Sequence, residues 1–358
     1  MKSKVDRFAN RRSFMQGSLT AGVALASASA LGAAEYRNDE LNAGDTAILR
    51  FLAAAELIET DLWQQYAELG GVTQGDQNPY QLALQQLDGD GSQYISSNTL
   101  DELSHAEFLN AYLISKGQQP VDFDRFRVLP SSQATGAQQI GRLTNLRRLT
   151  VDTSWYTRYR SAANPDFGAT FPQALPALFK GQFASIPLTN ADFDPPDHVQ
   201  ALANIAAFHF AMIEQGGSSL YATLGLKVSS AEVLRITMSI GGDEVAHFLE
   251  WVDFAGNSVQ QPVAPVTDPK TGLTFPDFNA TGNPLLQTNL IFPVPCEFIS
   301  PKLPHCAVIR PTAQGQIDAV GAAHAFISNG LFIGQSPAFS KLLLEMAQEA
   351  DSAYRENL

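Results

Sequence analysis

Apolar residues recur every three to four positions along four long segments of this 358-residue chain. Such spacing gathers them into one stripe on an α-helix, so each segment is predicted to bury one face against its neighbours. Asp45 is the expected N-cap of the first segment, and Gly70-Gly71 is expected to end it. The pattern predicts an all-α four-helix bundle, with helices at about residues 45–69, 92–115, 197–224 and 229 or 230 to 254.

The connections between these helices differ greatly in length. A short helix is predicted at residues 80–87, between the first two helices, and a tight turn at 225–229 joins the last two. About 80 residues separate the second helix from the third, far more than neighbouring antiparallel helices need. This spacing is typical of the long crossover of an up-down-down-up bundle. Within the crossover, residues 140–160 have helical spacing and predict a further helix packed across the bundle.

Residues 257–358 form a C-terminal extension whose composition differs from that of the bundle at 45–256. Pro, Thr and Asn are frequent up to about Pro311, which indicates a long loop with little regular structure. Helical spacing returns at residues 316–329 and 336–355. Apolar residues of the last segment are expected to pack either on the bundle or on a second subunit of a homo-oligomer; they are Leu342, Leu343, Leu344 and Met346.

One pattern of acidic and imidazole side chains occurs on both the second and the fourth predicted helix. The two copies read Asp-Glu-x-x-His, and residues at i and i+3 lie on one helix face, so each Glu and His can reach the same ion. The first and third helices each place one Glu on an apolar stripe, where a carboxylate needs a partner or a metal. These are the donors of a dinuclear bundle site. The six predicted metal ligands are Glu56, Glu102, His105, Glu214, Glu244 and His247.

Other residues near these ligands have different predicted roles. Asp101 and Asp243 precede the two Glu of the repeated pattern, and each is expected to accept a hydrogen bond from the His of the opposite helix. A metal-bound imidazole usually donates its second N–H to such a carboxylate. Glu59, one turn beyond Glu56, is a weaker ligand candidate; the alternatives are that it supports the ligands without binding the metal or that it lies on a solvated face.

The third helix carries a further histidine that is predicted to be structural. His209 lies about 140° around the helix from the Glu214 direction. Paired glycines also flank the predicted site, at residues 216–217 and 241–242. Glycine destabilises a helix interior by about 1 kcal/mol, so these pairs are expected to relieve crowding, to open a π-bulge or to allow close backbone packing.

Composition and charge limit the classes of partner. With 45% hydrophobic residues, the chain is able to bury a large core. Its formal net charge is −13, although the first 34 residues carry five basic side chains and one acidic one, so the remainder carries −17. Binding to nucleic acid or to an anionic membrane is therefore not expected, because both would repel the chain.

Residues 1–34 have the features of an export signal that is removed from the mature protein. Residues 10–16 resemble a twin-arginine signal, and a mildly apolar run of small residues follows to Ala34. The alternative is an uncleaved membrane anchor, which is disfavoured because the run is short and only weakly hydrophobic. The mature protein is expected to be periplasmic or extracellular and without membrane contact.

The chain contains two cysteines, Cys296 and Cys306, and both lie in the Pro-rich part of the extension. In an exported protein, a disulfide between them is expected, and it would contribute roughly 2 to 3 kcal/mol. A Cys/His metal site with His305 is the alternative, but it has too few ligands.

Residues 45–256 resemble the ferritin-like superfamily, and within it the exported bacterial ferritin-like proteins related to plant desiccation-related proteins. The resemblance rests on the six predicted ligands, on their neighbouring Asp residues and on residues 142–145, 151–155 and 164–168. It implies a bundle that holds a carboxylate-bridged pair of iron or manganese ions. The long crossover and the C-terminal extension differ from storage ferritins, so a cage-forming assembly is not expected.

The donor set predicts redox chemistry, because carboxylates and imidazoles suit iron or manganese in changing oxidation states. The first hypothesis is an oxidoreductase that acts on peroxide, O₂ or ferrous iron and protects the cell envelope. The alternative is a stress- or desiccation-related structural or binding protein whose metal only stabilises the bundle. A hydroxylase or desaturase is a third possibility, but no substrate pocket is recognisable in the sequence.

Overall fold

The computed structural model describes residues 41–164, 171–289, 293–308 and 317–356. The expected export signal at 1–34, and residues 165–168 of the family-like stretches, lie outside these ranges. The described residues from Leu41 onward belong to one compact unit. Among the described helices, none has the length and apolar character needed to cross a membrane.

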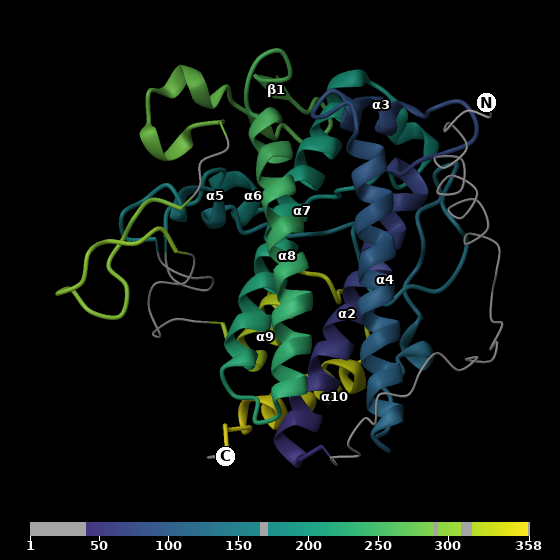
Figure 1. Cartoon of the computed structure of the whole chain (residues 1–358). Coiled ribbons are helices and arrows are strands. Elements are labelled where there is room, and N and C mark those ends of the chain that lie inside the picture. Colours follow the sequence, from purple (N-terminus) through teal and green to yellow (C-terminus); the bar gives the residue numbers. More distant parts are fainter. Residues whose placement is uncertain (1–40, 165–170, 290–292, 309–316, 357–358) are drawn as a thin grey trace, which may run out of the picture. The chain divides into compact units, whose positions relative to one another are not determined.

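The described part of the chain is mostly helical, which confirms the all-α prediction (Figure 1). Among the described residues, the only β-strands are two short ones. For the four long helices, the expected bounds agree with the observed ones to within about three residues. The four long helices are α2 (Ala43–Gly70), α4 (Gly91–Ser115), α7 (Pro196–Gly225) and α8 (Ala231–Asn257).

These four helices pack as two antiparallel pairs, α2 with α4 and α7 with α8 (Figure 1). The short helix α3 (Pro79–Gln85) connects the first pair, and the side chain of Gln200 near the start of α7 donates to the Ala83 carbonyl oxygen of α3 at 3.3 Å. The start of α7 therefore lies where α2 ends and α4 begins. Consequently α2 and α8 run in one direction, while α4 and α7 run in the other.

The N-cap predicted for the first helix is wrong by three residues. Asn42 caps α2 by accepting a hydrogen bond from the Asp45 backbone N–H at 2.7 Å. The Asp45 carboxylate instead accepts from the backbone N–H groups of Ser229 and Ser230, at 2.9 and 2.8 Å. It thereby ties the turn before α8 to the start of α2.

The helix predicted at residues 140–160 is also wrong, because only α5 (Ser154–Arg158) is helical there. Buried Asp61 of α2 accepts the backbone N–H groups of Leu143 and Thr144, at 3.0 and 2.8 Å. The backbone N–H and C=O of Arg142 are paired with those of Leu129. These partners replace the helical hydrogen bonds. The rest of the crossover contains η1 (Asp124–Phe126), α6 (Pro176–Lys180) and η2 (Asn190–Phe193).

The C-terminal extension packs on the bundle. Its loop forms a small antiparallel hairpin of β1 (Val266–Thr267) and β2 (Thr274–Phe275), then η3 (Phe278–Thr281) and η4 (Pro284–Leu286). Two helices follow, α9 (Ala319–Ser328) and α10 (Pro337–Asp351). Helix α10 lies against α2, and the expected apolar residues of α10 all contact the core of this chain, two of them as buried residues.

The predicted disulfide is absent, because Cys296 and Cys306 are both free thiols. The two residues pair as an antiparallel bridge in which each backbone N–H donates to the other's carbonyl oxygen at 3.0 Å. In such a directly opposed pair the Cβ atoms are about 5 Å apart, whereas a disulfide needs roughly 4 Å. No group of metal-ligand side chains among the described residues includes His305.

Candidate metal centre

The four long helices bring the six predicted ligands together in the interior. Glu56 comes from α2 and Glu214 from α7, while α4 and α8 each supply one Glu and one His. None of the six is more than 8% exposed. Their donor atoms form two groups in which all atoms lie within 4.8 Å of one another: Glu56, Glu102, His105, Glu244; and Glu102, Glu214, Glu244, His247. Because Glu102 and Glu244 belong to both groups, they lie between the two positions.

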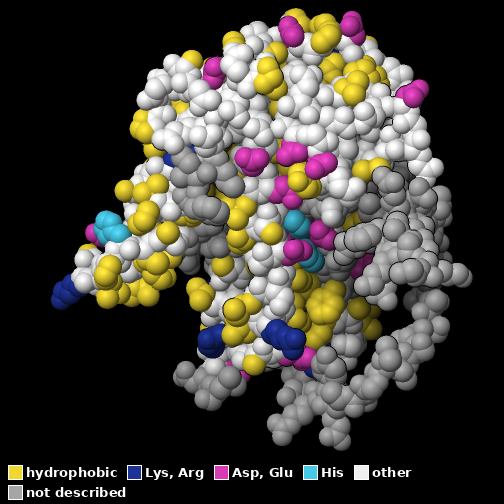
Figure 2. All heavy atoms as spheres, turned by 45° about the horizontal axis from the view of Figure 1, so that its top comes forward, with side chains coloured by type: hydrophobic (Ala, Val, Ile, Leu, Met, Phe, Trp, Pro, Cys, Tyr) yellow, Lys and Arg dark blue, Asp and Glu magenta, His cyan; other side chains and the backbone are white. Residues whose placement is uncertain are grey.

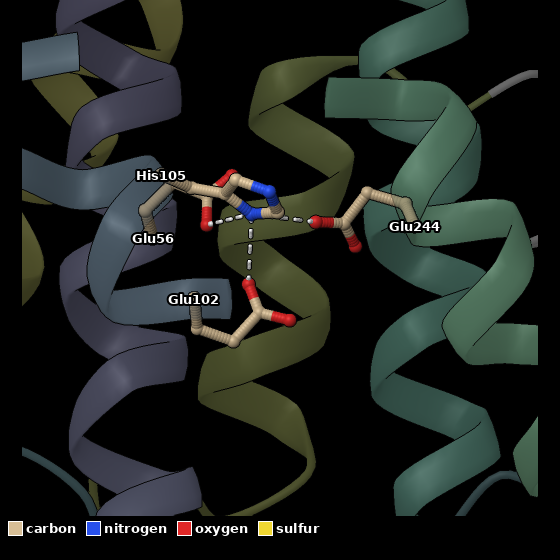
Figure 3. Close-up of side chains that lie close together, drawn as sticks. All are labelled: Glu56, Glu102, His105 and Glu244. Atoms are coloured by element: carbon tan, nitrogen blue, oxygen red, sulfur yellow. Dashed lines mark hydrogen bonds and ion pairs between the residues drawn. The ribbon is translucent and has the colours of Figure 1, made fainter. Parts of the chain in front are cut away.

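In the first group, the carboxylates surround one nitrogen of His105 (Figure 3). The Nδ1 atom lies 3.4 Å from Glu102 Oε2, 3.5 Å from Glu56 Oε2 and 3.6 Å from Glu244 Oε1. These separations exceed normal hydrogen-bond lengths. The space between the four donors is therefore wide enough for a bound ion.

The second group repeats this arrangement around His247. Its Nδ1 atom lies 3.1 Å from Glu102 Oε1 and 3.3 Å from Glu214 Oε2. The two imidazole rings have their centroids 6.3 Å apart. The two histidines thus face opposite oxygen atoms of the same Glu102 carboxylate, Oε2 for His105 and Oε1 for His247.

The outer nitrogen of each imidazole faces an aspartate of the opposite helix. His105 Nε2 lies 3.3 Å from Asp243 Oδ2, and His247 Nε2 lies 3.4 Å from Asp101 Oδ2. This is the cross-helix pairing expected from the sequence. Both Asp side chains are partly exposed, at 44% and 47%. Figure 2 shows imidazole groups among acidic side chains on this face of the molecule, so the centre approaches the surface between α4 and α8.

Burial makes the ionised carboxylates unstable unless a cation accompanies them. Burial, reinforced by the nearby charge of Glu214, raises the pKa of Glu102 to about 8. Burial and the charge of Glu102 raise the pKa of Glu244 well above its usual value. Both carboxylate oxygens of Glu244, and one each of Glu56 and Glu214, are buried without a hydrogen-bond partner. Buried acceptors of this kind need a cation, so the residues fit bound metal.

The carboxylates raise the pKa of both imidazoles, against the effect of burial. Burial alone would lower the pKa of His105, but its interactions with Glu102 and Glu56 outweigh burial and raise this pKa to about 10. The pKa of His247 is raised as well, because the charge of Glu214 and the contacts with Asp101 and Glu102 outweigh burial. Without metal, protonated imidazoles would partly neutralise the carboxylates.

Two side chains that the sequence did not single out bind the ligands directly. The Tyr221 hydroxyl of α7 donates to Glu56 Oε1. The Asn98 amide of α4 donates to Glu102 Oε1 at 2.7 Å and to Glu214 Oε1 at 3.2 Å. Asn98 lies four residues before Glu102, on the same helix face. That spacing, together with a polar residue on a buried stripe, was the signal available in the sequence.

The paired glycines relieve crowding beside the ligands. A Cβ atom at Gly217 would lie 2.1 Å from Glu244 Oε2, and one at Gly241 would lie 2.7 Å from the Tyr221 Cβ. Both helices stay α-helical through the glycines, so the suggested π-bulge is not present. The two outer glycines, Gly216 and Gly242, have no atom within 4 Å of such a Cβ.

Two further buried residues lie outside both ligand groups. Burial and the charges of Glu102 and Glu56 raise the pKa of Glu59 well above its usual value, yet Glu59 belongs to neither group. His209 packs away from the centre, where its Nδ1 atom lies 2.8 Å from the Tyr66 hydroxyl, and burial lowers its pKa to about 3. His209 is in the structural position expected from its place on the helix.

Comparisons of the chain with protein-family models, with curated proteins and with solved structures find no match.

Proposed function

We propose that this protein is a ferritin-like bundle that binds two iron or manganese ions and carries out redox chemistry on a small oxidant. The observation that carries the proposal is the pair of buried ligand groups that share the carboxylates of Glu102 and Glu244. One metal ion would need only one such group. Two groups joined by two carboxylates suit a pair of adjacent ions.

The donor chemistry supports iron or manganese. Each position offers carboxylate oxygens and one imidazole nitrogen, and these donors suit first-row ions that change oxidation state. When bound, such a pair supplies the electrons for reducing peroxide or O₂, or takes them from ferrous iron as the substrate. The absence of thiolates from both groups argues against a structural zinc site of the Cys-rich kind.

The surrounding residues would keep the donors in place. Asp243 and Asp101 hold the outer nitrogens of His105 and His247, which fixes how each ring faces the centre. Asn98 holds Glu102 and Glu214 through its amide. The Tyr221 hydroxyl holds a proton at Glu56 Oε1.

The place of action follows from the twin-arginine-like stretch at residues 10–16. Export of a protein that already carries its ions would place the activity in the periplasm or outside the cell. We therefore infer a role in protecting the cell envelope against peroxide or free ferrous iron.

Metal analysis and turnover assays on the same preparation test the proposal. Protein loaded anaerobically with Fe²⁺ or Mn²⁺ is expected to bind two ions per chain, and to consume hydrogen peroxide or oxidise added ferrous iron faster than buffer. The expected control is the Glu107→Gln variant, because Glu107 is exposed on α4 and belongs to neither group. Protein that binds two ions but is inert with both substrates would support the alternative, a stress-related protein whose metal only stabilises the bundle. Protein that binds no ion would contradict both the redox function and the stabilising role of the metal.

A further inference from the structure

Two buried tryptophans connect the candidate metal centre to a remote tyrosine. Trp251 lies one helical turn beyond His247 on α8, and its indole N–H donates to Asn98 Oδ1 at 2.6 Å. The amide of the same Asn98 donates to Glu102 and Glu214, so a hydrogen-bonded path joins the indole to two ligands of the centre. Trp251 is thus coupled to the centre without being one of its ligands.

Further aromatic rings continue this path away from the centre. Trp63 of α2 stacks on Trp251, with ring centroids 5.2 Å apart and an interplanar angle of 26°. The phenol of Tyr66 follows, with its centroid 5.8 Å from that of Trp63. Phe210 of α7 packs on all three rings, at centroid distances of 4.6 to 4.8 Å, and holds them together. Because Tyr66 lies ten residues beyond Glu56 on α2, it is about 15 Å from that ligand along the helix axis.

The path ends at a phenol that is paired with an imidazole. The Tyr66 hydroxyl lies 2.8 Å from His209 Nδ1 and 2.7 Å from Ser185 Oγ. Burial raises the pKa of Tyr66, so the phenol keeps its proton as long as it keeps its electrons. Burial also lowers the pKa of His209 to about 3, so the imidazole is neutral and one of its nitrogens is an acceptor. A phenol that has lost an electron is a strong acid, and its proton can then move to the hydrogen-bonded imidazole.

We propose that the two tryptophans and Tyr66 form a one-electron relay, in which Tyr66 is the terminal electron donor and His209 accepts its proton. The inference rests on the proposed function, because the oxidant is the peroxide or O₂ that acts at the centre, and it adds to that function a redox site in the protein itself. Indole and phenol are among the side chains most easily oxidised by one electron, and rings in contact exchange electrons quickly. The three rings are fully or almost fully buried, so solvent does not intercept the electron.

One electron and one proton leave Tyr66 in this step. The electron passes from ring to ring to the metal pair, whose charge falls by one, and the hydroxyl proton moves to His209 Nδ1. Tyr66 becomes a neutral phenoxyl radical, and His209 becomes an imidazolium. The peroxide or O₂ has by then taken the corresponding electron from the ions. The relay thereby moves an unpaired oxidising equivalent away from the ligands.

Freeze-quench electron paramagnetic resonance of metal-loaded protein mixed with hydrogen peroxide tests the relay. The wild type is expected to show a tyrosyl radical, and Tyr66→Phe to lose it. Trp63→Phe should form the radical at least about tenfold more slowly. The matched control is Trp155→Phe, because Trp155 is also a buried tryptophan whose indole N–H lacks a hydrogen-bond partner, and its ring contacts lie outside the path. The control should change the rate by less than about twofold, and all variants should bind as much metal as the wild type.

His209 has a spectroscopic signature that packing alone would not produce. In His209→Gln the phenol has no base for its proton, so the tyrosyl signal should fall by at least about tenfold. A tryptophan radical is expected in its place, because the electron is then drawn from Trp63 or Trp251. An unchanged tyrosyl signal in this variant would overturn the assignment of His209 as the proton acceptor.

A second measurement needs no variant. Peptide mapping of the wild type by mass spectrometry, after repeated exposure to peroxide, is expected to find oxidised side chains at Trp63, Trp251 or Tyr66 in preference to Trp155. Peroxide consumption without a protein radical, or equal radical rates in Trp63→Phe and Trp155→Phe, would overturn the relay and leave the proposed function intact. Loaded protein that is inert with both peroxide and O₂ would overturn the relay together with the proposed function.

Discussion

At the residue scale, the six ligands are not equivalent, because Glu102 and Glu244 belong to both groups while the other four each belong to one. The Glu102→Gln variant is therefore expected to reduce the bound metal from two ions towards none. The Glu56→Gln and Glu214→Gln variants should each retain about one ion. Elemental analysis of the purified, reloaded variants measures this difference. A similar loss in all three variants would contradict the assignment of Glu102 to a position between the ions.

His209 makes the stability of the fold depend on pH. Its pKa in the folded protein is about 3, below the ordinary value of 6.5, because burial disfavours the imidazolium. The contribution of neutral His209 to the free energy of unfolding is therefore fully present above pH 6.5. It is lost as the pH falls towards 3, since His209 is protonated in the unfolded chain at a higher pH than in the folded protein. Between pH 6 and pH 4, the free energy of unfolding should fall by about 2 kcal/mol less in the His209→Gln variant than in the wild type.

Urea unfolding of both proteins at the two pH values gives these free energies. Other titrating groups are common to both proteins and cancel in the comparison. Parallel pH dependence in the two proteins would contradict a buried, neutral His209.

At the element scale, the close approach of α7 to α8 is set by glycines. Gly217→Ala would place a methyl group 2.1 Å from the present position of Glu244 Oε2, so the carboxylate must move away from the centre. Its metal affinity is expected to fall at least about tenfold, whereas the melting temperature should change little, because alanine favours a helix by about 1 kcal/mol over glycine.

The neighbouring Gly216→Ala variant is the control, since its methyl group meets no atom within 4 Å. Isothermal titration with Mn²⁺ measures both affinities. Equal affinities would show that Glu244 tolerates the added methyl group without leaving its position.

The elements also show why some parts of the fold were predictable. Helical spacing of apolar residues over more than 20 positions predicted α2, α4, α7 and α8, because each helix buries one stripe along its whole length. The same spacing failed at residues 140–160. There the backbone hydrogen bonds go to Asp61, more than 80 residues earlier in the chain. A local pattern carries no information on such a distant acceptor.

The residues of the candidate centre were likewise predictable only in part. The repeated Asp-Glu-x-x-His pattern predicted which residues converge, since i and i+3 positions share a helix face. Tyr221 escaped prediction because its role depends on which helix lies opposite. Asn98 did carry a local signal, four residues before Glu102 on the same helix, but it lies outside the repeated pattern. The Cys296 and Cys306 prediction failed for a similar reason: sequence separation did not show that their backbones would pair directly.

At the scale of the whole molecule, metal binding and folding are expected to be coupled, because four buried glutamates from four helices meet at the centre. A free ion concentration of 100 times the dissociation constant would stabilise the fold by about 2.7 kcal/mol. Calorimetry of metal-free protein, with and without added Mn²⁺, is expected to show a higher melting temperature with the ion. The increase should be absent from Glu102→Gln. A melting temperature that does not respond to Mn²⁺ in the wild type would contradict the coupling.

The matching donors of the two helix pairs have unlike neighbours. Glu56 accepts from the phenol of Tyr221, whereas Glu214 accepts from the amide of Asn98. The two groups have the same types of ligand but not the same partners, so the two positions differ in electrostatic environment. Filling should then proceed stepwise, with a half-loaded form of the protein populated before the pair is complete.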